Sequence, residues 1–230
     1  MPSAQTRRLM GREPATGSRH VSERDLNWKY VDDSVVETET VVKARQQSLE
    51  LGIDPVTPAV GAQLAVIAAA ARAESIIEVG TGVGVSGLWM LQAVRGALLT
   101  SIDTENEYQQ HAREHFADAG IAPARVRLIA GRASEVLPRM NENSYDVVFI
   151  DADAPSVIEY VEHGLRLAKP GGCVLVARAL WKGRVADPAR RDDAATAFRE
   201  LIAELSASPA VATAVSPAGD GLLQIVKLGA

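Results

Sequence analysis

Residues 75–87 read S-I-I-E-V-G-T-G-V-G-V-S-G, an apolar run that ends in a glycine-rich turn. The run is typical of a buried strand, and glycines allow the backbone to turn tightly from a strand into a helix. In α/β proteins such a turn commonly cradles a nucleotide at the carboxyl end of the strand. The residues around the turn therefore decide both the fold class and the kind of ligand.

Strand-like and helix-like segments alternate from this turn onward. Short β-branched runs predict strands at 75–80, 97–103, 126–129, 146–151 and 173–177. Amphipathic segments between them predict helices at 86–94, 105–119, 134–140 and 156–167. This alternation indicates a parallel sheet that is covered by helices on both faces.

The end of the chain predicts a different connection. A long helix is expected after Asp187-Pro188, and two strand-like runs follow at 210–215 and 222–228, joined by the turn P-A-G-D-G. A hairpin of this kind places the last strand antiparallel to its neighbours. We therefore predict an α/β fold with a Rossmann-like, seven-stranded, mostly parallel sheet and an antiparallel last strand.

The N-terminal part precedes the sheet. Residues 1–22 are polar, carry arginines and lack periodicity, so we expect a flexible arm, followed by one domain over residues 23–230. A helix is expected over 34–51, because Ser34 and Glu37 form a capping-box pattern. A second helix is expected to follow Thr57 as its N-cap, with proline in its first turn.

Composition and charge limit the classes of partner. The chain has 230 residues and a formal net charge of −5, without a block of lysine and arginine in its core, which argues against a nucleic-acid partner. No stretch of 18 or more apolar residues occurs, so we expect no membrane span. The N-terminus lacks the apolar segment of a secretory signal, and the single cysteine, Cys173, cannot form an internal disulfide. These features indicate a cytoplasmic protein.

Two acidic residues distinguish the ligands that the turn could bind. Glu78 lies at the end of the first strand, where its negative charge would repel a pyrophosphate. Asp103 ends the next strand, 19 residues after Gly84, where a carboxylate can accept hydrogen bonds from both ribose hydroxyls. A cationic cofactor with an amino group and no phosphate, such as S-adenosylmethionine, suits both acids. The alternatives are a nicotinamide cofactor and a turn that only allows close packing of strand and helix.

Several ordered blocks then carry a resemblance to a known family. They are E-V-G-T-G-V-G-V-S at 78–86, S-I-D at 101–103, G-R-A-S-E-V-L-P at 131–138, Y-D-V-V-F-I-D-A-D at 145–153, L-W-K-G-R-V-A-D-P at 180–188 and G-D-G-L at 219–222. From about Ser34 to Val226 the chain resembles the class I S-adenosylmethionine-dependent O-methyltransferases, and is similar to the catechol and caffeoyl-coenzyme A enzymes.

Carried over by position, the resemblance implies a set of cofactor-binding residues. They are Val56 and Thr57 at the methionine part, Glu78, Gly80, Thr81 and Ser86 at the amino-acid tail and the turn, Asp103 at the ribose, and Gly131, Arg132 and Ala133 at the adenine. Asp151, at the end of the fourth predicted strand, would face both the cofactor and the acceptor.

The chain departs from this family at the metal site. The resemblance implies a lysine directly after the D-A-D block and Asp-Asn at the end of the next strand, where they serve as general base and metal ligands. This chain has Ala154 at the first place, and Ala177 and Arg178 at the second. Mg²⁺ needs several oxygen ligands. We therefore predict that the metal site is lost and that Arg178 pairs with Asp151 in its place.

Two functional hypotheses follow. In the first, the protein transfers a methyl group from S-adenosylmethionine to an oxygen of a small-molecule acceptor without a metal, with Asp151 and Arg178 as catalytic residues. In the second, it binds the cofactor without turnover and serves as a sensor or a partner subunit. The resemblance also implies a homodimer.

Other residues give weaker indications. His111 and His115 are four apart on a predicted helix, a spacing that suits a metal, but the pattern favours a solvent-exposed helix face. Trp28 and Tyr30 precede the first predicted helix and are candidates for a lid or for a contact between subunits.

Overall fold

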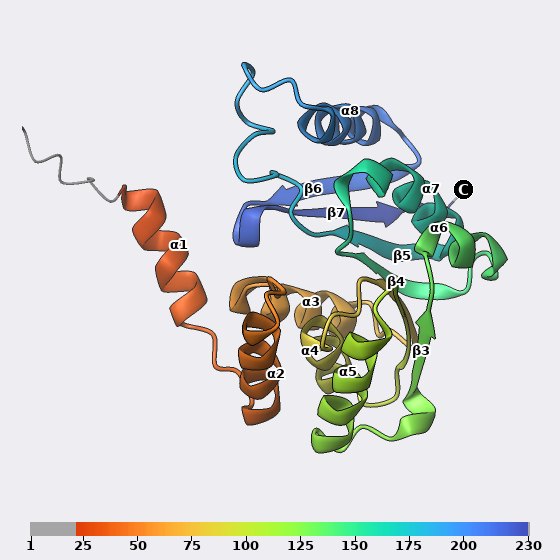
Figure 1. Ribbon diagram of the computed structural model, residues 1–230. Helices are drawn as coiled ribbons and strands as arrows, with labels where there is room; N and C mark the ends of the chain where they lie inside the picture. Colours follow the sequence, from red (N-terminus) through yellow and green to blue (C-terminus); the bar gives the residue numbers. More distant parts are fainter. Residues whose placement is uncertain (1–21, 230) are drawn as a thin grey trace, which may run out of the picture.

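A seven-stranded sheet runs through residues 22–229, the part of the chain that the computed structural model describes (Figure 1). The strands are β1 (Ser75–Val79), β2 (Leu98–Asp103), β3 (Val126–Ala130), β4 (Tyr145–Ile150), β5 (Ala168–Val176), β6 (Val211–Ser216) and β7 (Leu222–Lys227). Their order is β3-β2-β1-β4-β5-β7-β6. β7 runs antiparallel to both of its neighbours, and the remaining pairs are parallel. The predicted fold class and the antiparallel last strand are confirmed.

Helices cover both faces of this sheet (Figure 1). One face carries α2 (Glu39–Glu50), α3 (Pro58–Ala70), α4 (Val85–Ala93) and α5 (Asn106–Asp118), and the other carries α6 (Ala133–Val136), α7 (Val157–Leu167) and α8 (Asp193–Ala207). Within residues 22–229, no helix combines the length and the apolar character that a membrane span requires.

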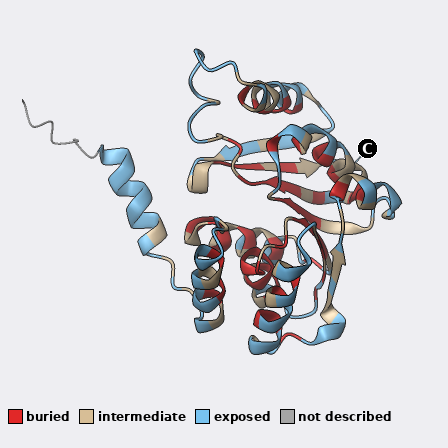
Figure 2. Ribbon diagram, viewed as in Figure 1, coloured by how far each residue is buried: buried red, intermediate tan, exposed pale blue. Residues whose placement is uncertain are grey.

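The apolar runs of the central strands are explained by burial on both sides. Along β1, Ile76 packs on the side of α3 and α4, while its neighbour Ile77 packs on the side of α7. Both side chains have no exposed surface, and Figure 2 shows the buried residues concentrated along the sheet and the helix faces against it. A strand that is buried on both faces has no polar alternation, which is why the sequence signal is a continuous apolar run.

The N-terminal helices differ from the prediction. The helix predicted over 34–51 is present as the shorter α2, which begins after its N-cap Thr38, and it is preceded by α1 (Glu23–Asp33), which was not predicted. Ser34 is the C-cap of α1, so the predicted capping box with Glu37 does not form. Glu37 instead pairs with Arg45 of α2, eight residues along the chain, a contact outside the capping pattern. Trp28 lies within α1 and not before the first helix.

α1 extends away from the body in Figure 1, and a contact near its end ties it to α3. Asp32 accepts a hydrogen bond from the backbone N–H of Ala59 at 2.9 Å. That donor lies in the first turn of α3, where backbone N–H groups lack partners within the helix. Thr57 is the N-cap of α3, as predicted, and its side chain accepts from Val60. The predicted arm lies outside the described residues, apart from Ser22.

Candidate active site

The glycine-rich turn follows β1 at the centre of the sheet, beside the end of β4. Gly80 has φ +94°, a conformation that disfavours side chains. A Cβ on Gly80 would lie 2.1 Å from the carbonyl oxygen of Asp151. Glycine is therefore required here because the backbone after β4 passes directly against the turn.

Asp103, at the end of β2, holds the same turn from the other side. One carboxylate oxygen accepts from the backbone N–H of Gly82 and the other from that of Glu105, each at 2.9 Å. The carboxylate is therefore fixed at the carboxyl edge of the sheet, where ligands of open α/β sheets bind.

Two adjoining cavities open along this edge. The first, of about 380 Å³, includes the predicted residues Val56, Gly80, Thr81, Ser86, Asp103, Asp151 and Arg178 in its wall. The second, of about 500 Å³, includes the predicted residues Gly131, Arg132 and Ala133 and shares Gly80, Asp103 and Asp151 with the first. The structure thus brings most of the predicted site residues together around one continuous groove.

Glu78 is one of two predicted residues that do not line the groove; the other is Thr57. The Glu78 side chain is fully buried and accepts hydrogen bonds from the hydroxyls of Ser86 and, at 2.6 Å, Ser101. Burial raises the pKa of Glu78 to about 7, against the opposing effect of the two hydroxyl donors. In this structure Glu78 fixes Ser86, which does line the groove, and does not itself reach the cavity.

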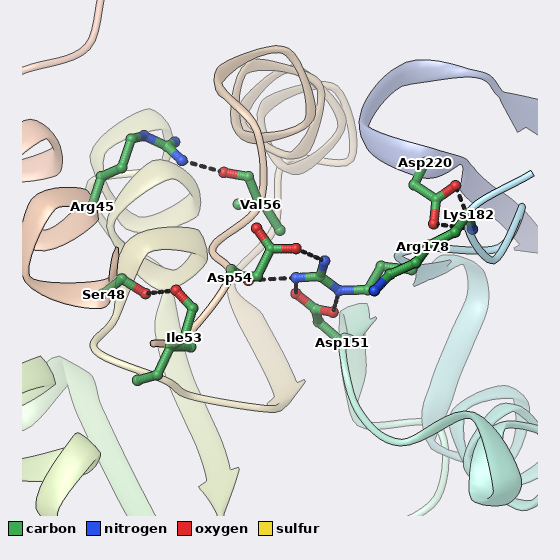
Figure 3. A network of polar contacts seen from close by, with 9 residues as sticks. All are labelled: Arg45, Ser48, Ile53, Asp54, Val56, Asp151, Arg178, Lys182 and Asp220. Carbon is green, nitrogen blue, oxygen red and sulfur yellow. Dashed lines mark hydrogen bonds and ion pairs between the residues drawn. The ribbon is translucent and has the colours of Figure 1, made fainter. Parts of the chain in front are cut away.

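Arg178 and Asp151 form the ion pair that the sequence predicts. Arg178 Nε lies 2.8 Å from Asp151 Oδ1, and Nη2 lies 3.4 Å from Oδ2 (Figure 3). Burial acts to lower the pKa of Arg178, but the attraction of Asp151 and Asp54 outweighs it and raises that pKa. The backbone N–H of Ala177 bonds to Ile150, so the residues after β5 lie directly beside the end of β4.

This arrangement does not fit a divalent cation. Ala177 offers no side-chain oxygen, and the guanidinium of Arg178 lies against the one carboxylate that the family pattern retains. Magnesium sites are built from oxygen ligands, and a bound guanidinium repels a cation. Among residues 22–229, no cluster of three histidine, cysteine or acidic side chains has the geometry to hold a metal ion.

The loop between α2 and α3 forms one wall of the first cavity and is held at two points (Figure 3). Ser48 donates to the carbonyl of Ile53 at 3.1 Å, and Arg45 donates to the carbonyl of Val56 at 2.6 Å. Arg45 is itself fixed by two hydrogen bonds to Glu37, which also accepts from Trp89. Val56 is thus positioned by a polar network that extends to α4.

Replacing Arg45 tests this network. Arg45→Met should lower the free energy of unfolding by about 2 kcal/mol, because it leaves the largely buried carboxylate of Glu37 without its charged partner. Urea unfolding of the variant measures the change. Lys43→Met removes the exposed pair with Glu39 on the same helix and is the matched control, which should behave as the wild type. Equal stability of both variants would show that the Arg45 network does not support the loop.

The segment after β5 is tied to the turn before β7. Ala179 and Leu180 donate backbone hydrogen bonds to Gly221 and Asp220 at 3.0 and 2.8 Å. The Asp220 carboxylate accepts from the backbone N–H of Lys182 (Figure 3). Arg178 therefore lies at the start of a segment whose path is set by the C-terminal hairpin.

Several groove residues were not predicted from the sequence. Asp153 and Tyr160 line the second cavity, and Asp54 and Tyr108 line the first. Asp153 stands in the quoted D-A-D block, and Tyr160 follows it by seven residues and donates to its carboxylate at 3.3 Å, so local spacing could have indicated this pair. Asp54 gave no local signal, because its partner Arg178 is 124 residues away.

The histidine prediction was wrong in one respect. His115 is buried rather than solvent-exposed, and its Nδ1 lies 2.9 Å from the carbonyl oxygen of Val83. His111 bonds to Gln47 of α2 at 3.0 Å. Both side chains thus help to attach α5 to its neighbours.

Comparison with known proteins agrees with this geometry. A sequence model of the O-methyltransferase family matches residues 31–228. A Mycobacterium tuberculosis protein named "Probable O-methyltransferase" is 42% identical over 218 residues, which cover 94% of this chain and 97% of that protein.

Solved structures extend the similarity. A Corynebacterium glutamicum protein superposes with a TM-score of 0.84 at 27% identity, covering 91% of this chain and 99% of its own. The O-methyltransferase TomG of Streptomyces achromogenes, solved with S-adenosylmethionine, has a TM-score of 0.78 at 27% identity and covers 89% of this chain and 96% of its own. The chain therefore belongs to the O-methyltransferase family and is an S-adenosylmethionine-dependent enzyme of this class.

Proposed function

We propose that this enzyme methylates an oxygen of a small-molecule acceptor without a divalent metal. The observation that carries the proposal is the guanidinium of Arg178, 2.8 Å from Asp151, beside Ala177. A fixed positive charge then stands where the resemblance implies a metal cation. Family membership favours catalysis over the alternative, a protein that binds the cofactor and has no turnover.

The groove fits the methyl donor along its length. Asp103 would accept from the ribose hydroxyls, and Gly131 to Ala133 would border the adenine together with Tyr160. Val56, Thr81 and Ser86 would surround the methionine part, while the buried Glu78 would hold the Ser86 hydroxyl from behind. When bound, S-adenosylmethionine would supply an electrophilic methyl carbon on a positively charged sulfur, with S-adenosylhomocysteine as the leaving group.

Arg178 would prepare that nucleophile. A guanidinium beside a hydroxyl favours its deprotonated form, so the pKa of the acceptor oxygen falls and its proton leaves to solvent. Asp151 holds the guanidinium in place through its Nε, and the loop 53–56 covers the cavity. Orientation of the two reactants within one groove supplies much of the rate acceleration.

Removal of metal tests the proposal. Calorimetric titration with S-adenosylhomocysteine should give the same affinity in EDTA and in Mg²⁺, and methylation of a panel of phenols and carboxylates should proceed equally in both buffers. The chain offers a matched variant, Ala177→Asp with Arg178→Asn, which supplies the family's ligands beside Asp151. This variant should gain a Mn²⁺ site that electron paramagnetic resonance detects. Loss of wild-type turnover in EDTA would contradict the proposal.

We also propose that the enzyme acts in the cytoplasm as a homodimer. The single cysteine and the family resemblance support this assignment. Exposed apolar side chains on α1, among them Leu26, Tyr30 and Val31, are suited to a contact between subunits. Sedimentation velocity of the full chain would reject the dimer if it gave a monomer at micromolar concentration.

The net charge of −5 favours a small-molecule acceptor over nucleic acid.

A further inference from the structure

Arg178 is shared by two carboxylates that differ strongly in exposure. The Asp151 side chain is 16% exposed and contacts Nε, whereas the Asp54 side chain is 78% exposed and contacts Nη1 at 2.8 Å. Nη2 also donates to the backbone carbonyl of Asp54 (Figure 3). Asp151 is therefore the interior partner of the guanidinium, and Asp54 is its partner on the solvent side.

Asp54 lies between the two points that fix its loop. The carbonyls of Ile53 and Val56, on either side, accept from Ser48 and Arg45. Asp54 and Pro55 thus cross the wall of the first cavity, and the Asp54 carboxylate can leave Arg178 without release of either anchor. An exposed ion pair of this kind contributes little stability, so replacing the Asp54 carboxylate with another anion on Arg178 costs little free energy.

Charge within the cavity makes this contact selective. Among the described residues that line the first cavity, Arg178 is the one basic side chain, against the acids Asp54, Asp103, Glu105 and Asp151. An anionic ligand would be repelled elsewhere in this wall, so its one favourable position is on the Arg178 guanidinium. Asp54 occupies the solvent-side edge of that guanidinium.

We propose that Asp54 stands in for an anionic oxygen of the acceptor and thereby selects the acceptor class. The acceptor carries a carboxylate or an acidic phenolate, which replaces the Asp54 carboxylate on Arg178 Nη1. A neutral acceptor would replace an ion pair, charged on both sides, with a hydrogen bond in which only the guanidinium is charged, so it competes poorly with Asp54. The inference rests on the proposed function, because it names the substrate class of the same site.

The test compares anionic and neutral probes on matched variants of the full chain. Benzoate, 4-nitrophenolate and the neutral benzamide are titrated by NMR, with and without saturating S-adenosylhomocysteine. Asp54→Asn removes the competing charge and keeps the shape. Glu50→Gln makes the same charge change at an exposed residue that bonds to Gln46 instead of Arg178.

Asp54→Asn should bind at least one of the two anions about three- to tenfold more tightly than the wild type, with benzamide unchanged. Glu50→Gln should match the wild type for every probe. A gain for benzoate alone or for nitrophenolate alone supports the proposal and identifies the acidic group. Equal gains for benzamide, or no gain for either anion, would overturn it. Failure of S-adenosylhomocysteine to bind the wild type would refute the proposed function separately, while the titrations without it still report on Asp54.

Discussion

Asp103→Ala should weaken the binding of S-adenosylhomocysteine about 100-fold or more. The carboxylate of Asp103 holds the backbone of the glycine-rich turn through Gly82 and lines both cavities, and we propose that it accepts from the ribose hydroxyls. Each hydrogen bond to a charged group contributes about 1.5–3 kcal/mol, so the loss of two ribose contacts corresponds to at least two orders of magnitude. Calorimetric titration of both proteins measures the change directly.

Two further variants show whether the effect belongs to the ribose contact. Asp103→Asn keeps one side-chain oxygen as acceptor and should lie between the alanine variant and the wild type. Asp118→Ala removes an exposed acid at the end of α5 and should leave the affinity unaltered. If Asp103→Ala bound within about threefold of the wild type, the ribose assignment would be wrong.

The second large effect is a pH dependence of stability that Glu78 introduces. The pKa of this buried carboxyl is raised from 4.5 to about 7, so between these values the folded chain binds a proton that the unfolded chain releases. Stability from this group is therefore present at low pH and falls as pH rises from about 4.5 to 7. The difference of about 2.5 pKa units corresponds to roughly 3 kcal/mol.

Glu78→Gln isolates this contribution, because glutamine has a similar shape and does not titrate. The free energy of unfolding of the variant minus that of the wild type should increase by about 3 kcal/mol between pH 5 and pH 8. Urea unfolding at both pH values measures it, since contributions from all other groups cancel in the difference. Glu107→Gln, an exposed position on α5, serves as the control. A difference that is independent of pH would mean that Glu78 is ionised throughout.

The fold could be predicted from local sequence because the strands are buried on both faces. Mostly apolar, β-branched runs such as 75–79 and 145–150 favour strands at the centre of a covered sheet. The first five residues of β5 escaped prediction because A-K-P-G-G contains both proline and glycine, which normally interrupt strands. The later start of α2 escaped prediction because Glu37 is engaged by Arg45 and Trp89, and tertiary contacts override a local capping pattern.

The candidate site was predictable where its parts lie at the ends of consecutive strands. Gly80 follows β1, Asp103 ends β2 and Asp151 follows β4. Parallel strands bring these three ends to one edge of the sheet. The contact of Arg178 with Asp54 was not predictable, because it depends on the path of a loop that is fixed by Arg45 and Ser48. Burial of Glu78 away from the groove likewise depends on the side-chain direction within β1, which the sequence motif does not specify.

The hydrogen bonds between the segment after β5 and the turn before β7 affect the order in which the parts of the site form during synthesis of the chain. Apart from Arg178, the residues that line the two cavities lie between Ser48 and Tyr160, which leave the ribosome well before the C-terminus. Arg178 lacks its final support until Asp220 has emerged and β7 has inserted between β5 and β6. The surroundings of Arg178 are therefore completed by the last strand to be synthesised, and on the function we propose this is the acceptor side of the groove.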